Sequence, residues 1–142
     1  MHLKTRELPY QQEINEYVKQ LIQHIRPRAV ILYGSVARGT FGVGSDIDIM
    51  IIADSLPQRF LDRLTLLYEL NKSGAPIEPV GYTSSEIDRM MLKGQPALYD
   101  ALEEGIDLYD DDFLDQARRT WESMKSEKGW TKTKIGWTRT KP

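Results

Sequence analysis

The chain lacks cysteine altogether and has only two histidines among its 142 residues. Without cysteine there can be no disulfide bond, thiol nucleophile or zinc–thiolate site, so packing alone must hold the fold. No apolar run approaches the roughly 20 residues of a membrane span, and the polar N-terminal segment lacks the apolar core of a signal peptide. We therefore expect a cytoplasmic protein that does not interact with membranes.

A strong charge of either sign is also missing, because 19 lysines and arginines stand against 21 aspartates and glutamates. This balance argues against attraction of the whole surface to nucleic acid. Residues 128–142 are the local exception, with five basic residues, no acidic one and two of the three tryptophans. We predict a domain over residues 1–127 and a basic tail over residues 128–142. Tryptophans are costly to leave in water, so we favour docking of the tail onto protein over disorder or binding to nucleic acid.

Apolar residues recur at helical and strand spacings along most of the chain. Helices are predicted over residues 9–25, 35–39, 57–71, 83–93, 96–105 and 111–127, and strands over residues 29–33, 46–52, 76–82 and 106–109. Two prolines restrict the third strand to a sheet edge or a strand end. The pattern predicts an α/β (α+β) domain with a small sheet of three to four strands packed with helices, followed by a C-terminal helix and the tail.

Two aspartates, Asp46 and Asp48, open the second predicted strand, although aspartate is depleted in strands. Residues two apart in a strand project from the same face, so the two carboxylates point together. Ile47, Ile49 and Ile51 project from the other face and fill the core. Neighbouring carboxylates repel one another unless a cation lies between them. Oxygen ligands without histidine or cysteine suit a hard ion, either Mg²⁺ or Mn²⁺.

The first predicted strand ends at Gly34–Ser35 and turns directly into a helix. Such a turn presents free backbone N–H groups and the positive end of a helix dipole to an anion. Glycine lets a phosphate approach the backbone closely, and the Ser35 hydroxyl can add a hydrogen bond. Arg38 can add positive charge to the same phosphates. A phosphate held beside a divalent ion is what phosphoryl or nucleotidyl transfer requires.

Together, Gly34–Ser35, ten intervening residues and Asp46-x-Asp48 resemble the signature of the DNA polymerase β-like nucleotidyltransferase superfamily. The wider stretch LYGSVARGTFGVGSDIDIMII is similar to that of the minimal nucleotidyltransferases. The resemblance implies that Gly34 and Ser35 hold the phosphates of a nucleotide and that Asp46 and Asp48 bind the metal. It also suggests Ser45 as a further phosphate contact.

The family usually has a third metal-binding or base-forming carboxylate, an aspartate, on a later strand. Glu78 is the best-placed candidate in this chain. Each assignment has a plainer alternative. Glu78 can be an exposed carboxylate of an edge strand, and Asp46 and Asp48 can form a solvated strand end. Arg38 can form a surface salt bridge, and Ser35 can cap a helix.

The resemblance implies a Mg²⁺-dependent enzyme that transfers a nucleoside monophosphate, AMP from ATP, to an acceptor hydroxyl. Minimal nucleotidyltransferases often pair with a small helical HEPN protein in toxin–antitoxin systems, and some adenylylate a tyrosine of that partner, so homo- or hetero-oligomers are expected. The alternative is an antitoxin-like subunit that acts by contact and has a weak or vestigial catalytic site. A third interpretation is an RNA-binding protein that uses the basic tail.

Overall fold

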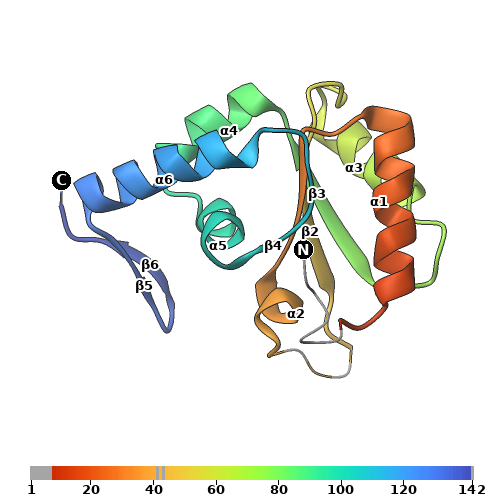
Figure 1. The fold of residues 1–142 in the computed structure, drawn as a ribbon, viewed down its shortest axis with the longest axis horizontal. Helices are drawn as coiled ribbons and strands as arrows, with labels where there is room; N and C mark the ends of the chain where they lie inside the picture. Colours follow the sequence, from red (N-terminus) through yellow and green to blue (C-terminus); the bar gives the residue numbers. More distant parts are fainter. Residues whose placement is uncertain (1–7, 41, 43, 142) are drawn as a thin grey trace.

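The computed structural model describes residues 8–40, 42 and 44–141 (Figure 1). Residues 1–7 of the polar N-terminal segment, positions 41 and 43 of the glycine-rich loop and the last residue of the tail lie outside this part. The helices are α1 (Gln11–Ile25), α2 (Gly34–Arg38), α3 (Phe60–Glu69), α4 (Ser84–Met91), α5 (Pro96–Glu104) and α6 (Leu114–Lys128). The strands are β1 (Ala29–Tyr33), β2 (Ile47–Ile52), β3 (Ile77–Tyr82), β4 (Ile106–Asp110), β5 (Trp130–Thr133) and β6 (Gly136–Arg139).

Four strands form a mixed sheet in the order β3-β2-β1-β4. β1 pairs antiparallel with β2 and β4, whereas β2 and β3 run parallel. β3 therefore lies at an edge of the sheet, as its two prolines predict, since proline cannot donate a hydrogen bond to the ladder. The mixed sheet of four strands confirms the predicted fold class.

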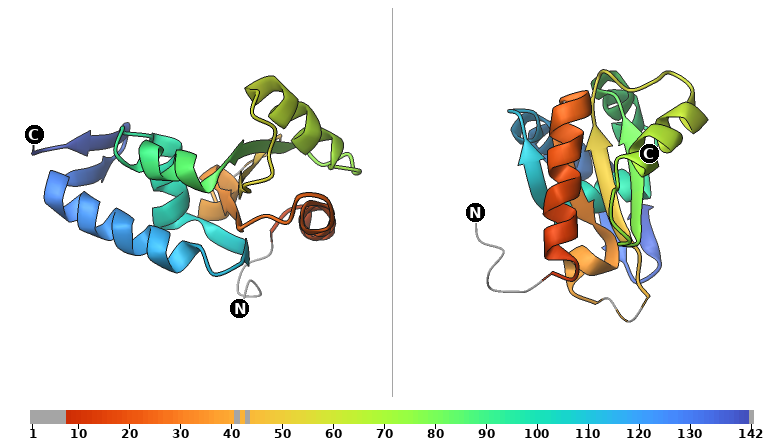
Figure 2. Two further views of the ribbon diagram at one scale, coloured as in Figure 1. Left: turned by 90° about the horizontal axis from the view of Figure 1, so that it is seen from above. Right: turned by 90° about the vertical axis from the view of Figure 1, so that its right-hand side faces the viewer.

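Helices cover both faces of this sheet, with α1 and α3 on one side and α4, α5 and α6 on the other (Figures 1 and 2). Strand alternation divides the core accordingly. In β2, Ile47, Ile49 and Ile51 pack towards α1 and α3, whereas Met50 and Ile52 pack towards α4, α5 and α6. By the same alternation, Asp48 belongs to the second face.

The predicted helices and strands are present with shifted ends. The second strand begins at Ile47, so Asp46 precedes it directly instead of opening it. α3 begins at Phe60 because the segment after Pro57 makes turns first. The predicted capping box at the start of α4 is formed, since Thr83 and Glu86 each accept a hydrogen bond from the other's backbone N–H. Within the described residues, no helix combines the length and the apolar character needed to cross a bilayer.

The tail forms an antiparallel β5–β6 hairpin that extends from the end of α6 (Figure 1). Its tryptophans pack on α5 and α6: the ring centroids of Trp130 and Trp137 lie 5.1 and 5.9 Å from that of Tyr99. Trp137 also meets Trp121 edge to face at 5.4 Å. The tail therefore docks on its own chain, while the boundary between residues 127 and 128 stays a prediction.

Candidate active site

The polar end of the sheet is built by two parallel neighbours, β2 and β3. Asp48 and Glu78 are register partners on these strands, so both side chains project from the same face. Asp46 lies one residue before β2 on that face and is exposed, as is Glu78, whereas Asp48 is half-buried. The structure thus brings the three predicted carboxylates to one end of one face.

The electrostatics of this end are repulsive. Burial raises the pKa of Asp48, the neighbouring charges of Asp46 and Glu78 raise it further, and Arg38 opposes the shift. Within the described residues, no three acidic or histidine side chains converge closely enough to form a ready metal site. The oxygen chemistry of the carboxylates fits a divalent cation, but the metal roles of Asp46, Asp48 and Glu78 stay predictions.

Gly34 lies directly against Asp48. The residue has a left-handed backbone with φ of 79°, and a Cβ atom added there would lie only 2.4 Å from Asp48 Oδ2. Only glycine fits both the conformation and the space. The turn that opens α2 is therefore in contact with the acidic end of β2, as the spacing of the two motifs requires.

Ser35 does not cap α2, because Tyr33 occupies the N-cap position and makes no side-chain cap bond. Its carbonyl oxygen accepts hydrogen bonds from the backbone N–H groups of Gly39 and Thr40, which close the short helix. Ser45 lies in the glycine-rich loop, where its hydroxyl accepts a hydrogen bond from Gly42 N at 2.9 Å. Phosphate contacts by Ser35 and Ser45 stay predictions.

Arg38 lies between the carboxylates and α5. Its guanidinium is 4.0 Å from Glu104 Oε1, so the structure contains the surface ion pair that is its plainer alternative. Glu104 also lies 3.6 Å from Lys132 of the hairpin, and Lys132 binds Asp100 at the same time. The hairpin is therefore linked to Arg38 through α5, a connection that the sequence does not reveal.

Tyr68 is the residue of this end that sequence reasoning missed. The helical pattern places it on the apolar face of the second long helix, but its hydroxyl donates a hydrogen bond of 2.6 Å to Glu78 Oε2. That bond, with burial and the charges of Glu78 and Asp46, raises the pKa of Tyr68 to about 12. One feature of the sequence does indicate this position: Tyr68 lies near the end of a helix, and the next element along the chain is the strand that carries Glu78.

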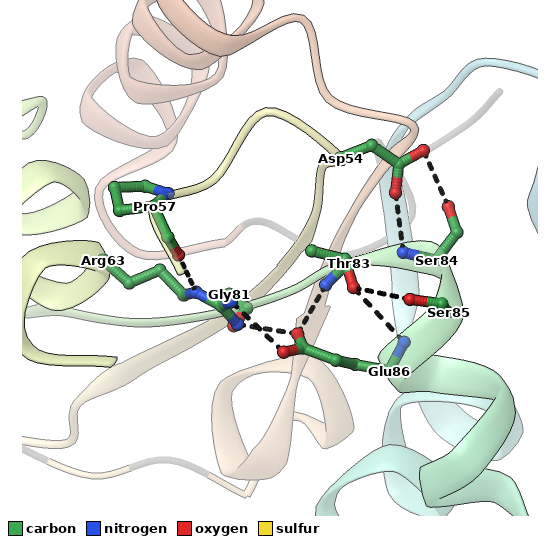
Figure 3. A network of polar contacts seen from close by, with 8 residues as sticks. All are labelled: Asp54, Pro57, Arg63, Gly81, Thr83, Ser84, Ser85 and Glu86. Atoms are coloured by element: carbon green, nitrogen blue, oxygen red, sulfur yellow. Dashed lines mark hydrogen bonds and ion pairs between the residues drawn. The ribbon is translucent and has the colours of Figure 1, made fainter. Parts of the chain in front are cut away.

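The opposite end of β3 carries a second polar network (Figure 3). Arg63, buried in α3, donates to both carboxylate oxygens of Glu86 at 2.7 and 3.1 Å. It also donates to the carbonyl oxygens of Pro57 and Gly81. The hydrogen bonds from Arg63 lower the pKa of Glu86, and burial opposes them only in part.

Comparison with known proteins agrees with this geometry. A sequence model of the nucleotidyltransferase domain matches residues 12–108, about two thirds of the chain. A relative from Methanocaldococcus jannaschii, named "Putative protein adenylyltransferase MJ1305", is 34% identical over an 85-residue alignment. The alignment covers 51% of this chain and 58% of that relative, so the chain matches little more than half of the relative's length.

Solved structures share the fold at low sequence identity. A structure described as "a putative nucleotidyltransferase from Sulfolobus solfataricus" is 18% identical, with a TM-score of 0.51 over 70% of this chain and 78% of its own. A toxin–antitoxin structure with AMP-PNP is also 18% identical, with a TM-score of 0.52 over 81% of this chain and 91% of its own. The match over residues 12–108, on a fold that sets a glycine turn against paired carboxylates, shows that this chain belongs to the nucleotidyltransferase domain family.

Proposed function

We propose that this protein transfers AMP from ATP to an acceptor hydroxyl in a Mg²⁺-dependent reaction. The observation that carries the proposal is the contact between the Gly34 turn and Asp48, with Glu78 in register beside Asp48. A turn that can receive phosphates thereby adjoins carboxylates that repel one another until a cation joins them.

In this mechanism each group has a separate task. Backbone N–H groups at Gly34 and Ser35 bind the phosphates, with the Ser35 and Ser45 hydroxyls as further donors. Arg38 leaves Glu104 to neutralise phosphate charge, which is feasible because an exposed ion pair with a separation of 4.0 Å is weak. Asp46, Asp48 and Glu78 hold Mg²⁺, which supplies Lewis acidity for the transfer when it is bound. Glu78, exposed beside Asp48, accepts the proton of the acceptor hydroxyl.

The proposed external acceptor is a tyrosine of a small helical protein of the HEPN type. Support comes from the name of the Methanocaldococcus jannaschii relative, a protein adenylyltransferase, and from the toxin–antitoxin structures among the fold relatives. A partner-supplied acceptor also suits the exposed positions of Asp46 and Glu78, which leave this end of the sheet accessible to another protein.

The test is ATP binding and transfer in the presence of Mg²⁺, measured with ATP labelled at the α-phosphate. The double substitution Asp46→Asn with Asp48→Asn is expected to lower transfer by about 10³-fold, the scale of losing a main electrostatic group of an active site. The matched control is Asp111→Asn with Asp112→Asn, a neighbouring exposed pair in the turn before α6. Absence of triphosphate binding, or equal rates in the two double variants, would exclude the proposal.

The same pair of variants separates catalysis from contact. An antitoxin-like subunit that acts by binding alone neutralises its partner equally well when Asp46 and Asp48 are both replaced by asparagine. An enzyme loses that neutralisation together with transfer. Binding of RNA through tryptophan stacking has less support, because Trp130 and Trp137 are packed against Tyr99.

A further inference from the structure

Tyr68 brings a hydroxyl of the chain itself to the acidic end of the sheet. The residue lies in the last turn of α3 and is 44% exposed. Its hydroxyl is 2.6 Å from Glu78 Oε2, within the reach that proton transfer to a carboxylate requires. Glu78 in turn is the register partner of Asp48. A nucleophilic oxygen, a proton acceptor and the proposed metal-binding carboxylates are therefore consecutive neighbours.

The position of Tyr68 is fixed by its surroundings. The preceding residue, Leu67, is fully buried, and its carbonyl oxygen accepts a hydrogen bond of 2.8 Å from the buried hydroxyl of Tyr17. After α3 the side chain of Asn71 donates to Ala75 O, which closes the turn that leads into β3. The end of α3 and the start of β3 are thus tied together, so Tyr68 and Glu78 are held side by side.

The other tyrosines lack this combination. Tyr17 and Tyr99 are fully buried, and their hydroxyls donate to backbone carbonyl oxygens. Tyr33 and Tyr82 are half-buried on the second face of the sheet. Tyr10 and Tyr109 lie before α1 and on β4. Among the described tyrosines, Tyr68 is the exposed one whose hydroxyl bonds to an active-site carboxylate.

We propose that Tyr68 is a self-modification site, at which the enzyme attaches a nucleoside monophosphate to its own chain. This inference rests on the proposed function, because the nucleotide and the site are the same. Tyr68 takes the place that an external acceptor hydroxyl occupies beside Glu78, so the attached nucleotide also blocks that place against other acceptors.

The step balances without any further reactant. Tyr68 Oη forms a bond to the α-phosphorus of ATP while the bond between that phosphorus and the oxygen bridging to the β-phosphorus breaks. The electron pair leaves with pyrophosphate, and the phenolic proton passes to the Glu78 carboxylate. The product is a phosphodiester between tyrosine and AMP, with no change in oxidation state.

The experiment uses the full chain alone, with ATP and Mg²⁺, and locates any added AMP by peptide mass spectrometry. Cleavage after Arg63 and Lys72 releases a peptide of residues 64–72, in which Tyr68 and Thr65 are the hydroxyl-bearing residues. Fragmentation of that peptide separates the two. We expect one AMP on Tyr68, and complete loss of this label in Tyr68→Phe, which keeps the ring.

Tyr109→Phe is the matched control, because Tyr109 lies on β4 at the opposite edge of the sheet and is expected to leave labelling unchanged. ATP binding is measured for each variant by calorimetry. Labelling of another residue, unchanged labelling in Tyr68→Phe, or release of AMP to water without modification of Tyr68 would overturn this inference and leave the proposed function intact. Failure of the wild-type chain to bind ATP would instead defeat the proposed function itself.

Discussion

The two ends of β3 hold carboxylates in opposite circumstances. Beyond its C-terminal end, Glu86 receives two hydrogen bonds from a buried arginine and one from Thr83 N. At its N-terminal end, Glu78 faces two further carboxylates and receives one hydrogen bond from Tyr68. The pKa of Glu86 is lowered mainly by Arg63, whereas burial and neighbouring negative charges raise the pKa of Asp48.

The difference separates a structural ion pair from the proposed reactive site, and the two lie at opposite ends of one short strand. Three hydrogen bonds already occupy most of the acceptor positions of the Glu86 carboxylate, and removal of its buried arginine partner is destabilising. Carboxylates that repel one another cost stability in the free protein, and a bound cation relieves that cost. Three pairs of variants test this contrast, beginning with the largest expected effect.

Arg63→Ala removes the arginine from the saturated end. It leaves Glu86 and the carbonyl oxygens of Pro57 and Gly81 without their donor, so we expect a loss of about 3 kcal/mol in the free energy of unfolding. Urea denaturation followed by circular dichroism measures it. The control is Arg59→Ala, whose side chain is 82% exposed and 4.0 Å from Asp62, with an expected cost under about 0.5 kcal/mol. Equal losses of unfolding free energy in the two variants would contradict the structural role of the Arg63–Glu86 ion pair.

Gly34→Ala probes the close contact at the acidic end. Alanine strains the backbone at φ 79°, which costs about 1–2 kcal/mol, and its Cβ displaces Asp48. Gly44→Ala imposes similar strain at φ 83°, but among the described residues its Cβ meets no atom within 4 Å. We expect both variants to be destabilised and only Gly34→Ala to lose Mg²⁺-dependent ATP binding. Calorimetric titration with ATP in the presence of Mg²⁺ measures the affinity of both variants. Equal affinities would show that the glycine turn is not part of the nucleotide site.

Asp48→Asn has the smallest expected effect on stability. The informative result is whether the substitution raises or lowers the free energy of unfolding. The folded-state pKa of Asp48 is raised, so the protonated side chain stabilises the fold. This contribution to the free energy of unfolding is present below the unfolded-state pKa and is lost as pH rises through the folded-state pKa. The variant should therefore be more stable than the wild type at pH 7, by a few tenths of a kcal/mol.

Glu86→Gln is the opposite case. The folded-state pKa of Glu86 is lowered, so its stabilisation is present above the unfolded-state pKa and is lost as pH falls through the folded-state value. This variant should be less stable than the wild type at pH 7 and approach it in acid. Thermal unfolding of both variants from pH 7 down to about pH 2 measures the two trends. Changes of the same sign at pH 7 would contradict the distinction between the two ends of β3.

Local patterns were enough to predict much of the acidic end. Asp46 and Asp48 are two residues apart, so strand alternation alone sets them on one face. The glycine turn follows from an apolar strand that stops at Gly34. The two prolines correctly indicate that β3 is an edge strand. These features depend on neighbours in the sequence, which is why the sequence reveals them.

Features that depend on tertiary contacts were not predictable in the same way. Tyr68 fits a helical apolar pattern, and only the turn between α3 and β3 brings its hydroxyl to Glu78. Arg63 is a residue type that is expected on the solvated face of a helix, yet the residue is only 4% exposed. The basic residues of the tail obscure the β5–β6 hairpin, although the β-branched threonines of both strands and the glycine at 136 are signals of a hairpin.

All three tryptophans of the chain gather around or beside the buried ring of Tyr99. Tryptophan fluorescence therefore reports on a single locality, where α5, α6 and the hairpin meet, and none of the three tryptophans lies at the carboxylate end of the sheet. The ion pairs of Glu104 with Arg38 and with Lys132 link the carboxylate end of the sheet to this locality. The protein thus carries its own optical reporter of whether the hairpin responds to the nucleotide.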